Sequence, residues 1–136
     1  PPAGRAFDLK SAYTISGWFG DAYADLIPDR VEAALILGDA ADSTGAAHIA
    51  TRLALESTGV TFPLARLDRA VTDPAREPSP ILVGRSNALV KALEKIGKAR
   101  FEDLRPGEGA IQIVPAAFGA ATATVVAGAD AAGRSR

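Results

Sequence analysis

Short apolar runs alternate with amphipathic stretches from residue 31 onward, which indicates an α/β layer architecture. The run 31–38 (VEAALILG) is too short for a helix of its own and ends in a glycine, so it predicts a buried strand. The stretch 42–59 predicts a helix that ends at Gly59, because one stripe of its surface is apolar: Ala46, Ile49, Ala50 and Leu53.

A second strand–helix unit follows the first. The run 60–67 (VTFPLARL) predicts a strand, but Pro63 lacks the N–H that a central strand needs, so this strand belongs at an edge of the sheet. The run 81–84 (ILVG) predicts another buried strand. The stretch 86–97 predicts a helix with Ser86 as its N-cap and with an apolar face made of Leu89, Val90, Leu93 and Ile96.

The last part of the chain predicts two antiparallel strands, 110–115 and 122–128. Asp130 would cap a final helix that is cut short at the end of the sequence. We therefore expect an α/β fold of the α+β sandwich kind, in which a mixed sheet of about five strands carries two helices on one face. Residues 31–136 would form this single domain, and residues 1–30 an N-terminal aromatic arm.

Three of the predicted strands end in the same kind of corner, at Gly38, Gly84 and Gly128. A glycine between a strand and a helix is also where phosphate groups bind. However, none of these corners has the Gly-Lys-Ser/Thr of a P-loop or the three spaced glycines of a dinucleotide site. We interpret the glycines as turns that allow close packing, and we predict no cofactor.

Composition narrows the classes of function. The formal net charge of −1 gives no electrostatic attraction to nucleic acid. The chain has no cysteine, and His48 is its only histidine, which excludes thiol catalysis and metal sites built on thiolates or on a histidine cluster. The apolar runs are far shorter than the roughly 20 residues that cross a bilayer, so we expect no membrane insertion.

The most unusual stretch is the aromatic arm. Its segment 13–30 holds Tyr13, Trp18, Phe19 and Tyr23, four of the eight aromatic residues, together with Asp21, Asp25 and Asp29. Flat rings beside carboxylates are typical of sugar-binding surfaces, which makes Trp18, Phe19, Asp21 and Tyr23 the candidate ligand-binding residues. The alternative is that the rings pin the arm to the sheet or to a neighbouring domain.

A small hydrolase that uses a pair of carboxylates is a further alternative. Its candidate residues would be Asp21, Asp25, Asp39 and Glu108. Their spacing along the chain carries no information about separation across a cleft, and no Gly-x-Ser-x-Gly motif offers a serine nucleophile. We assign no catalytic residue and expect this chain alone to be noncatalytic.

Several motifs resemble those of known carbohydrate enzymes. A helix closing in Ser-Thr-Gly before "VTFPL", the strand "ILVG", the strand "GEGAIQI" and the run "VVAGADAAG" are similar to the small α/β domain that precedes the catalytic barrel in family 20 hexosaminidases and in α-glucuronidases. The resemblance covers residues 31–133. More loosely, the corners resemble the flavodoxin-like modules in the periplasmic subunit of bacterial cellulose synthase.

This resemblance implies a noncatalytic accessory domain of a larger, secreted, carbohydrate-active protein, with a glycoside hydrolase as the parent enzyme. Its partner would be a neighbouring domain of the same polypeptide, and its location would be extracytoplasmic, in the periplasm or outside the cell. The alternative function is a stand-alone glycan-binding module that uses the aromatic arm. Fold analogy by itself does not establish either function.

Overall fold

A computed structural model describes residues 7–61 and 63–128 of the chain. Its centre is a five-stranded mixed sheet in the order β4-β3-β5-β7-β6, in which β6 is antiparallel to β7 and all other neighbours are parallel. These strands are β3 (Leu35–Leu37), β4 (Ala65–Leu67), β5 (Ile81–Val83), β6 (Gly109–Val114) and β7 (Ala123–Gly128). The predicted fold class and the strand number are therefore confirmed.

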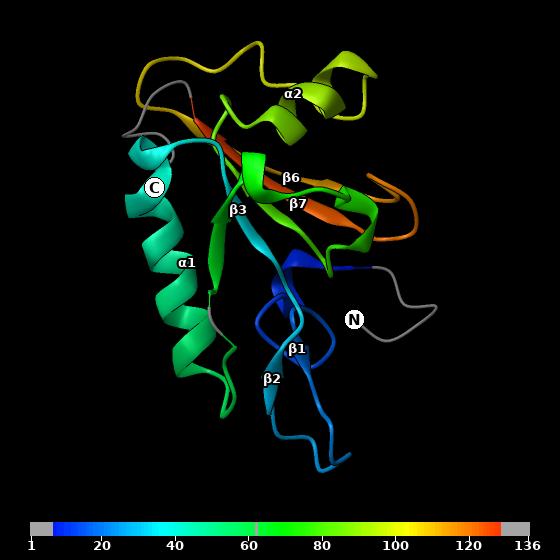
Figure 1. Cartoon of the computed structure of the whole chain (residues 1–136). Helices are drawn as coiled ribbons and strands as arrows, with labels where there is room; N and C mark the ends of the chain where they lie inside the picture. The colour runs from blue at the N-terminus through cyan, green and yellow to red at the C-terminus, as the bar shows by residue number, and fades with distance from the viewer. Residues whose placement is uncertain (1–6, 62, 129–136) are drawn as a thin grey trace.

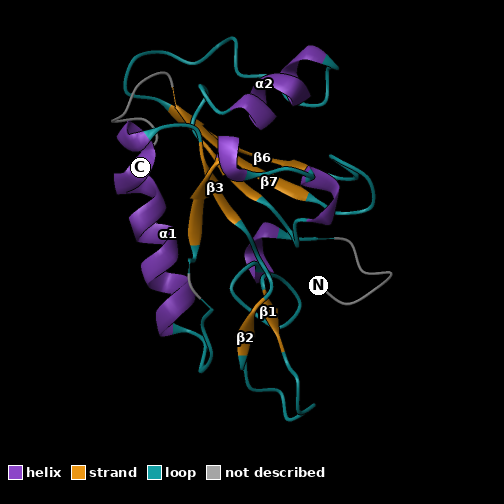
Figure 2. Cartoon of the chain, viewed as in Figure 1, coloured by secondary structure: helices purple, strands orange, loops and turns teal. Residues whose placement is uncertain are grey.

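Two α-helices cover the sheet, α1 (Ser43–Leu55) and α2 (Ala88–Lys95). They lie on opposite faces, as Figures 1 and 2 show, so the expectation of two helices on one face is wrong. Val90 and Leu93 of α2 pack with Leu82 of β5, whereas Leu53 of α1 packs with Ile81 of the same strand. Successive residues of a strand point to opposite faces, so an uninterrupted apolar strand needs cover on both sides.

The N-terminal arm adds a second, two-stranded sheet that the sequence did not predict. Strands β1 (Phe19–Gly20) and β2 (Arg30–Val31) pair antiparallel and form a hairpin. Figure 1 shows this hairpin extending away from the five-stranded sheet, with the 3₁₀ turn η1 (Leu9–Ser11) between the two sheets. Three further 3₁₀ turns lie in connections: η2 (Ala40–Asp42), η3 (Asp68–Ala70) and η4 (Pro74–Arg76).

The corner after β5 is held by a buried carboxylate. Gly84 has a φ of +97°, and a Cβ atom added to it would overlap the carboxylate of Asp42. That carboxylate is 1% exposed and accepts a hydrogen bond of 3.1 Å from the backbone N–H of Asp39. Gly84 is therefore required for the close approach of two corners, as the sequence analysis proposed for glycines of this kind.

A buried asparagine joins the same corner to the sheet and to α2. The side-chain amide of Asn87 donates to the carbonyl oxygen of Ile36 at 3.0 Å, and its oxygen accepts from the N–H of Leu89 at 2.9 Å. Asn87, rather than the predicted Ser86, is thus the N-cap of α2. Asparagine can cap the helix and satisfy a buried strand carbonyl at the same time, because its amide carries both an acceptor and donors.

The predicted strand 60–67 is short in the structure, where only Ala65–Leu67 pairs with the sheet. It lies at the edge, which confirms the position that Pro63 predicts. The predicted antiparallel pair 110–115 and 122–128 is confirmed, with β6 beginning and ending one residue earlier and β7 beginning one residue later than expected. The expected final helix falls on residues 129–136, which lie outside the described part of the chain.

Candidate functional site

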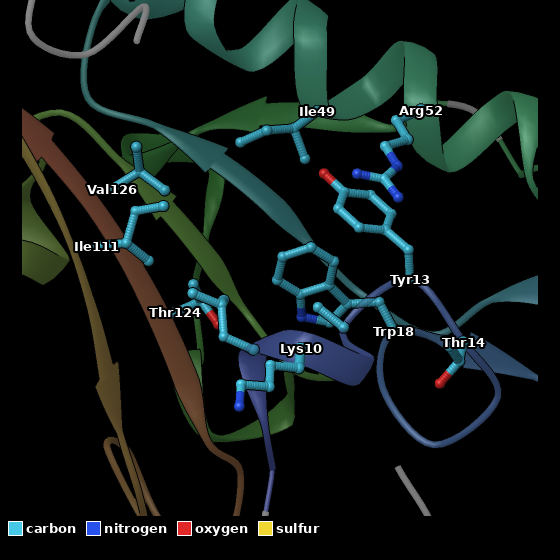
Figure 3. A pocket seen from close by; sticks show the side chains of 11 residues that line it. Lys10, Tyr13, Thr14, Trp18, Ile49, Arg52, Ile111, Thr124 and Val126 are labelled. Carbon is cyan, nitrogen blue, oxygen red and sulfur yellow. The ribbon is translucent and has the colours of Figure 1, made fainter.

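A cavity of about 300 Å³ lies on the α1 face of the five-stranded sheet. Its walls come from η1 and the following loop, from α1, and from strands β6 and β7, as Figure 3 shows. The lining is largely apolar, and its residues are Leu9, Lys10, Ala12, Tyr13, Thr14, Trp18, Ile49, Arg52, Ile111, Thr124 and Val126. Among these described residues, two have cationic side chains, Lys10 and Arg52, and none has a carboxylate.

One wall of the cavity is an aromatic cluster from the arm. The rings of Tyr13 and Trp18 meet edge to face, with centroids 5.0 Å apart and planes at 88°, and Phe7 packs on Trp18 with centroids 5.8 Å apart. Aromatic pairs prefer such tilted arrangements because of their quadrupoles. The cluster fixes the arm against α1 and the sheet, since its members belong to the same buried core as Leu53.

Arg52 of α1 lies over this cluster. Its guanidinium carbon is 4.0 Å from the centroid of the Tyr13 ring, and its Nε donates to the Glu56 carboxylate at 2.7 Å. Partial burial raises the pKa of Tyr13, although the Arg52 charge acts in the opposite direction. The hydrogen bond to Glu56 raises the pKa of Arg52, so the guanidinium stays protonated, and the Glu56 carboxylate pairs with it on this side of the cavity.

The structure divides the four predicted ligand-binding residues into two groups. Trp18 and Phe19 are buried, with 4% and 1% of their surface exposed, and they pack in the core beneath α1. Tyr23 is 81% exposed and lies with Asp21 in the loop between β1 and β2. The four therefore form no single surface, and the burial of the first two is what the packing alternative expects. Binding of a glycan by the arm stays a prediction.

The loop between β1 and β2 is held in shape by its own aspartates. The Asp21 carboxylate accepts hydrogen bonds from the N–H groups of Leu26 at 2.9 Å and Asp25 at 3.2 Å. The Asp29 carboxylate accepts two from the N–H of Ala22, at 2.8 and 3.0 Å. These contacts explain the aspartate-rich composition of the arm: the carboxylates replace the partners that backbone N–H groups have in regular structure.

Asp21 also makes the loop sensitive to acid. Desolvation acts to raise its pKa, but the hydrogen bonds from Leu26, Asp25 and other N–H groups outweigh it, so the pKa lies below the ordinary 3.8. A carboxylate whose folded-state pKa is lowered stabilises the fold above its unfolded pKa and loses that effect as the pH falls. The loop should therefore keep its shape at neutral pH and loosen progressively below pH 3.8.

Asp21→Asn should loosen the same loop at neutral pH, because a neutral amide oxygen is a weaker acceptor than a carboxylate. We expect faster hydrogen exchange at the N–H of Leu26, measured by NMR, with the core amides unchanged. Asp103→Asn is the matched control, since Asp103 is exposed and no hydrogen bond to its side chain is found among the described residues. Equal exchange at Leu26 in the two variants would show that Asp21 does not order the loop.

The carboxylates considered for a hydrolase have local partners too. Asp25 accepts from the N–H of Ile27 at 3.1 Å, Asp39 caps η2, and Glu108 accepts from the N–H of Arg105 at 2.9 Å. His48 is exposed on α1. Within residues 7–61 and 63–128, no group of three or more histidine, aspartate or glutamate side chains is placed to hold a metal ion.

The cavity itself is not predictable from local sequence patterns. Its cationic residues, Lys10 and Arg52, are separated by more than forty positions, and their approach depends on how the arm folds against α1. The one usable signal is that Arg52 follows Ile49 on the apolar side of the helix, where a charged residue needs an explanation. The loop between β1 and β2 also exposes two apolar residues, Leu26 and Ile27, and no sequence pattern indicated that exposure.

Comparison with known families changes the interpretation of the motifs. The family model described as "S-layer like family, outer domain" matches residues 6–135. No curated protein matches the chain. The predicted kinship with the accessory domains of hexosaminidases and α-glucuronidases, and with the cellulose synthase modules, is therefore wrong. The motifs behind it are strand ends, glycine corners and helix caps, which parallel α/β domains of unrelated families need for the same physical reasons.

The match also bears on location. An S-layer like family indicates a cell-surface or extracellular setting. This setting agrees with the expected extracytoplasmic location. In the described part of the chain, no helix has the length and apolar character needed to span a bilayer. Because the match extends over nearly the whole sequence, the chain belongs to the S-layer like family, where it corresponds to the outer domain.

Proposed function

We propose that this chain is a structural domain of a protein layer at the cell surface, and that it works by packing against neighbouring protein. The observation that carries the proposal is the family match over residues 6–135. The description as an outer domain also supports the expectation that another domain of the same polypeptide is its neighbour.

The use of polar groups in the structure supports a structural role. The charged side chains that stood out in the sequence stabilise turns: Asp21 and Asp29 order the hairpin loop, and Asp39 caps η2. Asn87 is fully buried and connects two layers of the fold. Such groups give a domain one well-defined shape, which a repeating layer needs.

Surface labelling of intact cells of the source organism tests the proposal. An antibody raised against the chain should label unpermeabilised cells as strongly as permeabilised ones, and removal of the surface protein layer should remove the signal. An antibody against a cytoplasmic protein, which should label only permeabilised cells, is the control. Labelling that appears only after permeabilisation would contradict the proposed location and role.

A further inference from the structure

Exposed apolar side chains gather at two places on the surface. The seven large hydrophobic residues that the described structure exposes are Leu9, Tyr23, Leu26, Ile27, Leu55, Ile96 and Ile111. Tyr23, Leu26 and Ile27 lie in the loop 21–29 between β1 and β2, which we call the knob. Leu9 and Ile111 line the cavity on the α1 face. Five of these seven residues therefore belong to one projection and one hollow.

The knob is built to keep its apolar side chains exposed. Tyr23 is 81% exposed and Leu26 77% exposed, although the loop around them is ordered by the Asp21 and Asp29 carboxylates. Ala24 and Leu26 have φ values of 56° and 67°, a left-handed conformation that residues other than glycine adopt at a cost. Strain of this kind persists only where surrounding contacts enforce it, and it gathers at functional sites.

The cavity has the complementary character. Its hollow is mostly apolar and holds the edge of the Tyr13–Trp18 pair, and Lys10 and Arg52 are its charged residues. Figure 3 shows these two side chains on opposite sides of the aromatic rings. The knob carries three carboxylates and no basic residue between positions 21 and 29. An acidic projection with an apolar tip thus matches a hollow with an apolar floor and two cations, Lys10 and Arg52, the second of which is also paired with Glu56.

We propose that the knob of one copy of this chain docks into the cavity of a second copy. This inference rests on the proposed function, because it names the packing contact that a surface layer would repeat. The knob extends away from the sheet in Figure 1, while the cavity lies on the α1 face, so the contact joins two different surfaces. Such a heterologous contact leaves one free knob and one free cavity at the ends, and successive copies add without limit unless a ring closes.

The contact is expected to be weak for a single pair. One loop inserting in a cavity of about 300 Å³ buries far less than the roughly 800 Å² per partner that stable complexes bury. The preformed shape of the knob lowers the entropic cost of docking. In a layer, each copy makes the contact twice, once through its knob and once through its cavity, and other contacts with its neighbours also hold it in place. Several weak contacts then give a strong combined attachment.

Sedimentation velocity of the chain over a range of concentrations tests the proposal. We expect the average mass to rise without a plateau at the dimer. Ile27→Asp in the knob and Ile111→Asp in the cavity should each weaken association at least tenfold. Ile96→Asp is the matched control, because Ile96 is exposed near the end of α2 on the other side of the sheet and lies in neither surface. It should associate like the original chain.

A mixture of the two weakened variants is the decisive measurement. The Ile27→Asp chain keeps its cavity and the Ile111→Asp chain keeps its knob, so the mixture should form a one-to-one dimer and nothing larger. Thermal melting checks that each variant folds. If Ile111→Asp does not fold, Lys10→Glu replaces it, since Lys10 is exposed and the reversed charge should repel the acidic knob.

Three results would overturn the proposal: no association up to millimolar concentration, equal association of Ile27→Asp and Ile96→Asp, or no dimer in the mixture. The absence of association is the result expected if another segment of the same chain fills the cavity. The test is separate from the cell-labelling experiment. A chain that labels the cell surface but does not associate through the knob would keep its proposed function and lose only this contact.

Discussion

Gly84→Ala is expected to lower the free energy of unfolding by about 3–5 kcal/mol, measured by urea denaturation. Two costs add up. The φ of +97° is unfavourable for any residue with a Cβ atom, by about 1–2 kcal/mol. The larger cost comes from overlap with the Asp42 carboxylate, which must move although it is buried and holds the N–H of Asp39.

Gly97→Ala separates these two costs. Gly97 has a φ of +77°, but a Cβ atom added to it would meet nothing within 4 Å. This control should lose only the backbone share, about 1–2 kcal/mol. Equal stability of the two alanine variants would mean that the Asp42 carboxylate can move aside at no energetic cost. The close approach of the two corners would then not contribute to stability.

Leu82→Ala should cost about 3–5 kcal/mol of unfolding free energy. Leu82 is fully buried in the central strand β5, opposite Ile36 and Val125 of the neighbouring strands. On its face of the sheet it packs with Val90 and Leu93 of α2. Truncation leaves a cavity that strands held in register on both sides cannot close.

Leu55→Ala is the matched control for this prediction. Leu55 is the last residue of α1 and is 80% exposed, so the same chemical change should alter the unfolding free energy by less than about 0.5 kcal/mol. Chemical denaturation of both variants gives the comparison. A loss below about 1 kcal/mol for Leu82→Ala would mean that α2 does not pack on β5.

Most of the five-stranded sheet could be predicted because each of its strands carries a local signal. The uninterrupted apolar run of β5 and the amphipathic pattern of α2 are visible within a few residues. The side of the sheet on which a helix lies is a different matter, since it depends on the handedness and order of the crossover connections. The run Ile81–Val83, apolar at every position, already implied cover on both faces, and that implication decides against two helices on one face.

The site was harder to predict, because it is made by long-range contacts. The burial of Trp18 depends on α1, whose residues in the same core, Ala46 to Leu53, lie 28 to 35 positions away. The two-residue strands of the hairpin are also too short to give a periodic pattern. The aspartates stand out in the sequence, but a sequence alone cannot tell a carboxylate that binds a ligand from one that holds its own loop.

The hairpin that carries the knob also determines how the domain would respond to mechanical force. Its two strands are joined at the tip, so a pull on the knob draws both in the same direction and does not separate β1 from β2. The load passes along both backbones to the base of the hairpin, where Trp18 and Phe19 are buried and the Glu32 N–H donates a hydrogen bond of 2.7 Å to the Trp18 carbonyl oxygen. To yield, the hairpin must pull Trp18 and Phe19 out of the core, which resists far more than a surface loop would.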